Sequence, residues 1–157
     1  MATYTAQVAW ALGEGEDFAR GRYSRAHILS FDGGAQIDAS SSPHVVPAPW
    51  SVESAVDPEE MFVAAVANCH MLTFLHKARE AGLRVLGYRD HAVGVMEPNA
   101  VGRLAITRIT LRPEVIYDGA APSTEASEAL HHAAHRDCFI ANSVTTDIQV
   151  EGRAAVG

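Results

Sequence analysis

The chain has 157 residues, a length that fits one domain with a core large enough to be stable without disulfide bonds. Its 12 Lys and Arg against 19 Asp and Glu give a formal charge of −7, which argues against binding to nucleic acid or to anionic membrane surfaces. No apolar run is long enough to span a bilayer, and no secretory signal opens the sequence. We therefore expect a cytoplasmic protein that forms a single domain over residues 1–157.

The first third of the chain predicts a β-hairpin followed by a long loop. Apolar and polar residues alternate over 4–10 and again over 22–31, as they do in half-buried strands. In the second strand this alternation places Tyr23 and Arg25 on one face. Residues 37–56 contain three Pro and five Ser, which is typical of an ordered surface loop with one short strand.

Residues 58–81 carry the strongest helix pattern in the sequence. Asp57 is a good N-cap, Pro58 suits the first helical position, and Gly82 is a typical stop. The centre of this helix is apolar on nearly every side. Such a pattern is typical of a helix buried inside a fold or at a subunit interface.

The second half of the chain predicts strands over 83–97 and 103–117, a helix over 122–138 and a last strand over 143–152. The resulting order is β-β-α-β-β-α-β. This order predicts an α+β domain in which two helices pack against an antiparallel sheet.

The two cysteines allow three interpretations: inert core thiols, metal ligands or redox groups. Cys69 lies in the apolar helix, where a cysteine most often acts as a small hydrophobic residue. Its polar neighbours Asn68, His70 and Thr73 favour a functional site, because a buried helix would have to satisfy them. The other cysteine is Cys138.

A metal site is one alternative for the second cysteine. His131, His135 and Cys138 are spaced i, i+4 and i+7, which places them on one face of a helix, and Cys69 or His70 could complete a zinc site. The spacing permits zinc without specifying it. On this interpretation the protein would be a non-catalytic binder of metal or of a small molecule.

Arg25 is the third candidate feature. A solvated strand residue or a plain salt bridge would explain it, but an arginine near a thiol lowers the thiol pKa and produces a thiolate at neutral pH. Glu59 or Glu60, at the start of the helix, could hold such an arginine, although both acids also suit the helix dipole.

The segment "DPEEMFVAAVANCHML", the glycine-terminated helix, the hairpin after it and the second helix ending in "AHRDCFIANSV" together resemble the OsmC/Ohr family of osmotically inducible and organic hydroperoxide resistance proteins. The resemblance covers nearly the whole chain. It implies an intertwined homodimer in which two long helices pack centrally, with active sites at the subunit interface.

The resemblance also implies a function and the residues that perform it. Cys69 would attack the peroxide, Cys138 would resolve the product, and Glu59 and Arg25 would assist. Because the residues around the arginine and after both cysteines depart from the best-known branches, Arg22 remains a rival to Arg25. The implied activity is thiol-dependent reduction of organic hydroperoxides without metal or cofactor, with a dithiol such as a lipoyl group as reductant.

Overall fold

The structure is a computed structural model that describes residues 1–156. The chain divides into two compact units, Met1–Met61 and the residues from Phe62 onwards. The boundary falls in the first turn of helix α1 (Pro58–Glu80). Among the described residues, no helix is long and apolar enough to cross a membrane.

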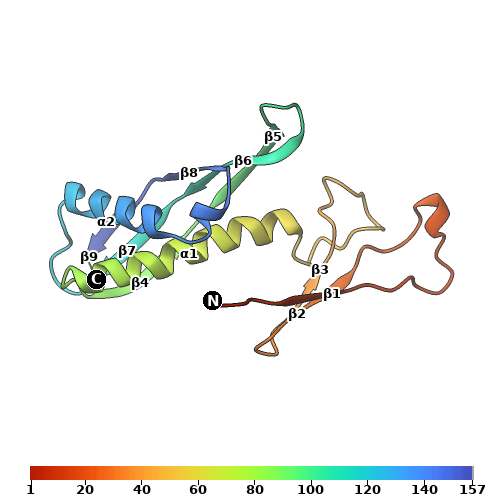
Figure 1. Cartoon of the computed structure of the whole chain (residues 1–157), viewed down its shortest axis with the longest axis horizontal. Coiled ribbons are helices and arrows are strands. Elements are labelled where there is room, and N and C mark those ends of the chain that lie inside the picture. Colours follow the sequence, from red (N-terminus) through yellow and green to blue (C-terminus); the bar gives the residue numbers. More distant parts are fainter. Residues whose placement is uncertain (157) are drawn as a thin grey trace. The chain divides into compact units, whose positions relative to one another are not determined.

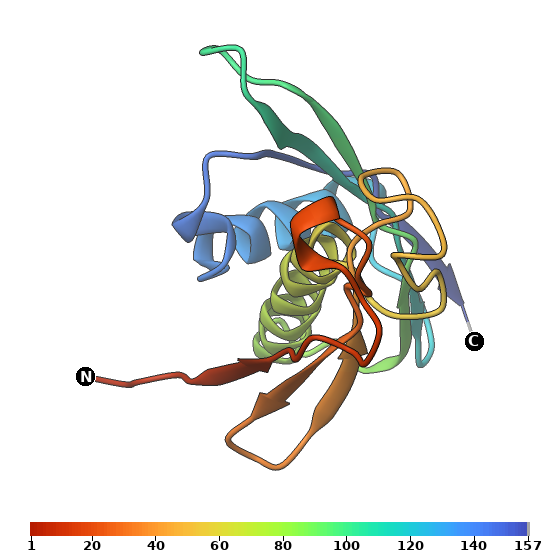
Figure 2. The same cartoon turned by 90° about the vertical axis from the view of Figure 1, so that its right-hand side faces the viewer.

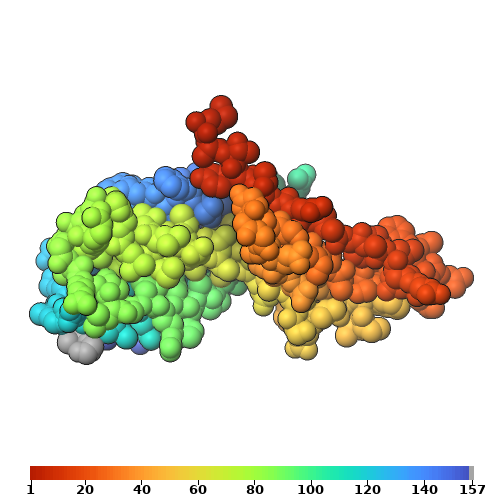
Figure 3. Space-filling view, turned by 90° about the horizontal axis from the view of Figure 1, so that it is seen from below, coloured from red at the N-terminus to blue at the C-terminus, as the bar shows by residue number. Residues whose placement is uncertain are grey.

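The first unit contains one antiparallel sheet of three strands in the order β1–β2–β3. Its strands are β1 (Ala6–Ala9), β2 (His27–Phe31) and β3 (Gln36–Ala39). The predicted pairing of the first two strands is confirmed, with Val8 opposite Leu29. The second strand begins later than predicted, because the 3₁₀ turn η1 (Phe18–Arg20) and a loop precede it. Figure 3 shows the first residues, in dark red, projecting from the rest of this unit.

The serine-rich loop of the first unit is held by hydrogen bonds rather than left open. The backbone N–H of Ser40 donates to the carbonyl of Val56 at 3.1 Å, and the N–H of Val52 donates to the Ser40 hydroxyl at 3.0 Å. Ser40 is fully buried. Because its buried polar groups are satisfied within the loop, this segment is ordered, as predicted.

Helix α1 begins and ends with the predicted signals. The Glu60 N–H donates to Asp57 Oδ1 at 2.7 Å, and the Asp57 N–H donates to Glu60 Oε2 at 3.1 Å, which together form a capping box. At the other end Gly82 has φ +74°, and the N–H of Leu83 donates to the carbonyl of Ala78 at 2.9 Å. The left-handed conformation suits glycine and closes the helix.

The second unit contains two sheets of three strands, β4–β7–β9 and β5–β6–β8, and the helix α2. Its elements are β4 (Val85–Asp90), β5 (Val93–Pro98), β6 (Leu104–Leu111), β7 (Pro113–Tyr117), α2 (Thr124–Asp137), η2 (Ala141–Ser143), β8 (Asp147–Val150) and β9 (Arg153–Val156). Ser123 caps α2 by accepting from the N–H of Ala126. Figures 1 and 2 show α2 beside α1 and the β5–β6 turn extending away from both helices.

The prediction of a purely antiparallel sheet is wrong for the last two strands. β4 pairs with β7 and β5 with β6 in antiparallel fashion, but β8 runs parallel to β6 and β9 parallel to β7. The chain leaves β7 through α2 and returns as β8 and then β9. A helical crossover of this kind lets the returning strands run parallel to β6 and β7, which precede the helix. The fold is therefore α+β with mixed sheets.

The two long strands predicted over 83–97 and 103–117 are each broken in two. The breaks lie opposite one another, since Asp90 is the partner of Pro113 across the sheet. The N–H of Arg112 donates to Asp90 Oδ1 at 2.7 Å instead of to a strand backbone, and Pro113 has no N–H to donate. These two features bend the ribbon and divide it between two sheets.

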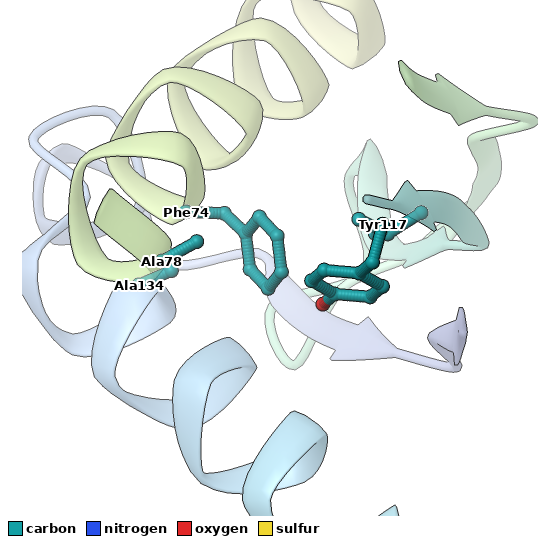
Figure 4. Packing of buried hydrophobic residues seen from close by; sticks show 5 residues of the cluster. Phe74, Ala78, Tyr117 and Ala134 are labelled. Carbon is teal, nitrogen blue, oxygen red and sulfur yellow. The ribbon is translucent and has the colours of Figure 1, made fainter. Parts of the chain in front are cut away.

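The core of the second unit has two apolar clusters, and α1 contributes to both. The first joins α1, β7 and α2 through buried residues that include Phe74, Tyr117 and Ala134. Figure 4 shows Phe74 directed toward Tyr117 while Ala78 and Ala134 meet between the helices. The second cluster is formed by Val66, Ile109 and Leu111.

Candidate active site

The fold of the second unit brings the two cysteine sulfurs together. Cys69 lies in the middle of α1, and Cys138 is the residue at which α2 ends. Their sulfurs are 2.7 Å apart, and both thiols are free. Two cysteines separated by much of the chain thus form one pair, which favours redox chemistry over two unrelated core thiols.

Hydrogen bonds distinguish the two sulfurs. The Cys138 thiol donates to Cys69 Sγ, and the Ile140 N–H lies 3.5 Å from the same sulfur. Burial, together with the hydrogen bond to Cys69, raises the pKa of the Cys138 thiol to about 11. Cys138 therefore keeps its proton at neutral pH, and Cys69 Sγ accepts the hydrogen bond that the Cys138 thiol donates.

Access from solvent also differs between the sulfurs. Cys138 is 1% exposed, whereas Cys69 is half-buried. A reagent can therefore reach Cys69 more easily than Cys138. Each sulfur accepts one backbone N–H, Cys69 from Ile140 at 3.5 Å and Cys138 from Ala141 at 3.4 Å. Accessibility and the direction of the hydrogen bond between the two thiols are therefore what favour Cys69 as the reactive thiol.

A second polar contact joins the same two helices. His70 Nε2 lies 3.1 Å from His131 Nδ1, and both side chains are buried. Burial lowers the pKa of His70 and of His131 to about 4, with neighbouring histidines contributing in the same direction. Both rings are therefore neutral at physiological pH.

The zinc site considered from the sequence is not assembled. Across residues 1–156, no three His, Cys, Asp or Glu side chains lie so that they could hold a metal ion together. The side chains that would form it have other partners, because His131 is hydrogen-bonded to His70 and the Cys138 thiol donates to Cys69. His131 and His135 lie on α2, whereas Cys138 is its C-terminal cap and has an extended backbone.

Arg25 and Glu59 both line a cavity of about 380 Å³ in the first unit. The aromatic side chains Trp10, Phe18 and Tyr23 line it as well. The Arg25 guanidinium lies 3.7 Å from the centre of the Tyr23 ring and donates to the backbone carbonyls of Gly21, at 3.0 Å, and Tyr23. These contacts hold the charged group at an apolar wall, where an arginine is rare unless something fixes it.

Arg22, the rival arginine, is exposed and does not line this cavity. Among residues 1–156, no ion pair joins Arg25 to Glu59 or Glu60. Glu60 instead accepts the Asp57 N–H in the helix cap. Arg25 is thus held by carbonyl groups and an aromatic ring rather than by a carboxylate.

Two groups of contacts, one in each unit, were not predicted. The contacts among Trp10, Phe18 and Tyr23, with ring centroids 4.7 to 6.1 Å apart, join residues that the alternating pattern assigned only to separate strands and loops. The His70–His131 hydrogen bond joins different helices. No local pattern signals the contact between the histidines. For the aromatic contacts, the one available signal was the alternation that places Tyr23 on the same face as Arg25.

The fold and the site together define a class of protein. It is an α+β protein in which two helices bring a half-buried thiol against a buried one. The family model of OsmC-like proteins matches residues 51–152, and the chain belongs to this family. No curated protein sequence matches the chain significantly.

Solved structures agree with this assignment. An OsmC-like protein of unknown function from Vibrio cholerae is 47% identical, with 98% of this chain and 100% of that chain covered and a TM-score of 0.94. An organic hydroperoxide resistance protein from Elizabethkingia anophelis is 14% identical, with coverage of 100% and 98% and a TM-score of 0.67. The organic hydroperoxide resistance protein OhrB of Bacillus subtilis is 17% identical, with 98% of each chain covered and a TM-score of 0.64. The last two likenesses concern the fold.

Proposed function

We propose that this protein is a thiol-dependent peroxidase that reduces organic hydroperoxides. The observation that carries the proposal is the contact between the Cys69 and Cys138 sulfurs, in which Cys138 donates the hydrogen bond. A thiolate acceptor beside a protonated donor is the arrangement that a two-cysteine reduction needs. The organic hydroperoxide resistance proteins with the same fold support the choice of substrate class.

The reaction follows from the two sulfurs. The Cys69 thiolate attacks the terminal oxygen of the hydroperoxide, so that an S–O bond forms as the O–O bond breaks. The departing alkoxide takes a proton and leaves as an alcohol, and Cys69 becomes a sulfenic acid. The Cys138 sulfur then attacks Cys69, a disulfide forms, and the sulfenic oxygen leaves as water. An external dithiol, of which a lipoyl group is the candidate, reduces the disulfide again.

Arg25 and Glu59 are proposed to assist this step. A guanidinium stabilises both a thiolate and the negative charge that develops on the leaving oxygen, most strongly where water is excluded. Arg25 is favoured over Arg22 because Arg25 is half-buried in an aromatic-lined cavity. Apolar and aromatic walls of this kind favour organic hydroperoxides over hydrogen peroxide.

We also propose that the protein is an obligate homodimer. Helix α1 has no continuous polar face, and Leu72 at its centre is 57% exposed. Association would remove such apolar surface from water. Light scattering at micromolar concentration is expected to give the mass of a dimer; a monomer with normal secondary structure would contradict this proposal.

Peroxide consumption and intact mass test the proposed activity. With one equivalent of an alkyl hydroperoxide, we expect the wild-type protein to lose two hydrogens as the Cys69–Cys138 disulfide forms. Cys69→Ser should consume no peroxide. Cys138→Ser should react once and then accumulate sulfenic and, with excess peroxide, sulfinic acid on Cys69, because no internal thiol traps the first product. Full activity in Cys69→Ser would overturn the proposal.

A further inference from the structure

The buried His70–His131 pair is the feature of the second unit that the proposed chemistry leaves unused. The two imidazole rings are nearly parallel, with centroids 5.4 Å apart, and the His131 ring also stacks on Phe74 at 4.3 Å. Among residues 1–156, His70 Nδ1 and His131 Nε2 have no hydrogen-bond partner. The bond between the two rings is thus the only hydrogen bond that either side chain makes within the described residues.

Such a pair costs stability compared with an apolar contact. The surrounding cluster contains Phe74, Ala78 and Ala134, and an apolar pair of similar size would pack there without orphaned nitrogens. What a hydrogen bond adds is direction, because its strength depends on angle and distance, whereas apolar packing tolerates sliding. The pair is therefore suited to fixing how α2 lies against α1.

The position of the histidine pair relative to the sulfurs explains why the orientation of α2 matters for the two cysteines. His70 directly follows Cys69 on α1, so both links to α2 start from the same turn. On α2, His131 and Cys138 are seven residues apart, which is about 10 Å along a helix axis. Two hydrogen bonds that start from one turn of α1 and end far apart along α2 prevent α2 from rotating about either contact. A single hydrogen bond would not prevent this rotation.

The remaining polar contact between the helices cannot replace the histidine pair. Lys77 Nζ lies 2.8 Å from Asp137 Oδ2, next to Cys138. Both of these side chains are partly exposed, at 24% and 38%. Because water and salt screen such a pair, it holds the helix end more loosely than a buried hydrogen bond does.

We propose that the His70–His131 hydrogen bond positions α2 so that Cys138 stays within bonding reach of Cys69 during resolution. His70 and His131 are positioning residues: within residues 1–156, neither side chain is hydrogen-bonded to a sulfur. This role rests on the proposed peroxidase function, and it makes a separate claim about the second step. The histidine bond decides how fast Cys138 captures the sulfenic acid on Cys69.

Over-oxidation measures this capture rate. The sulfenic acid on Cys69 either condenses with the Cys138 thiol, releasing water, or reacts with a second hydroperoxide to give a sulfinic acid and an alcohol. The peroxide concentration at which half of the protein becomes sulfinic acid therefore reports the speed of resolution. Intact mass separates the disulfide from the sulfinic acid.

Substitutions of His131 provide the test. His131→Leu keeps the side-chain size and removes the hydrogen bond, so it should lower the half-over-oxidation concentration by about fivefold or more. His131→Asn places an amide near the position of Nδ1 and should restore much of the wild-type value. Val115→Ala, which weakens the same apolar cluster from β7, is the stability-matched control and should leave the value unchanged.

A second measurement does not depend on peroxide. Equilibration with reduced and oxidised glutathione measures the effective concentration of Cys138 at Cys69, because Cys138 displaces glutathione from a mixed disulfide on Cys69. His131→Leu should lower this concentration by a similar factor, while His131→Asn and Val115→Ala should not. His70→Leu, compared with His70→Gln, repeats the test if a His131 variant fails to fold.

The outcomes separate this inference from the proposed function. If Cys69 does not react with hydroperoxides, the peroxidase proposal fails, and the glutathione measurement still decides the role of the histidines. If the folded His131→Leu protein matches wild type in both measurements, the positioning role is overturned. It is equally overturned if Val115→Ala changes both values as much as His131→Leu does.

Discussion

The two cysteines differ in the backbone that carries them, one inside a helix and the other at a helix end. Cys69 lies within α1, where its carbonyl also accepts a hydrogen bond from the Thr73 hydroxyl at 2.9 Å. Cys138 lies where α2 ends, with an extended backbone at φ −72° and ψ 117°, before the short turn η2. A helix interior moves little, whereas a helix end can yield locally. This contrast supports an attacking sulfur on a fixed element and a resolving sulfur on a segment that can adjust.

Alkylation should show the largest difference between the two regions. At pH 7 we expect a limiting amount of iodoacetamide to modify Cys69 far faster than Cys138 in the native protein. With a pKa of about 11, only about one Cys138 thiol in 10⁴ is ionised at that pH. Peptide mass mapping locates the label. Equal labelling of the two cysteines in folded protein would remove the distinction between them.

Arginine substitution should give the next largest effect. Arg25→Ala is expected to slow peroxide reduction more than about tenfold, which corresponds to about 1.4 kcal/mol of transition-state stabilisation. Arg22→Ala is the matched control and should change little. Stopped-flow kinetics with an alkyl hydroperoxide measures both variants. The opposite ranking would transfer the role to Arg22, and two unchanged variants would rule out the electrostatic assistance.

Acidic pH should destabilise the His70–His131 contact between α1 and α2. His70 and His131 have folded-state pKa values of about 4, against 6.5 in the unfolded chain. The neutral rings therefore favour the folded state above about pH 6.5, and this stability is lost as the pH falls toward about 4. A His70→Gln/His131→Gln double variant should lose less stability than wild type over this window. Urea unfolding at several pH values measures the difference, and parallel pH profiles would contradict the expectation.

The smallest effect is expected at the turn after Cys138. Ile140 has φ −70°, a value that proline adopts, so Ile140→Pro should remove the N–H that approaches Cys69 Sγ without straining φ at that residue. We expect alkylation of Cys69 to slow by about threefold relative to Ile140→Ala, which keeps the N–H but loses the side chain. Iodoacetamide kinetics compares the two variants. An identical rate in both would show that this N–H does not stabilise the thiolate.

Local sequence signals were sufficient for the main helix and for the family. The Asp57 cap and the Gly82 stop place α1 within one residue of its observed end, because capping depends only on neighbouring residues. The cysteine-bearing helices were recognisable for the same reason. The sequence also singled out Arg25 by its company with Tyr23, and the structure shows that these two side chains touch.

Contacts between distant segments were decided only by the tertiary structure. The parallel pairing of β8 with β6 and the bend at Asp90 and Pro113 depend on which strands meet, and no local periodicity encodes that choice. The same holds for the sulfur contact and for the His70–His131 bond, since each joins α1 to α2 through packing. The sequence determined which helices carry the two cysteines. Their packing decided that the two thiols meet and that His131 is hydrogen-bonded to His70, because side-chain partners depend on long-range geometry.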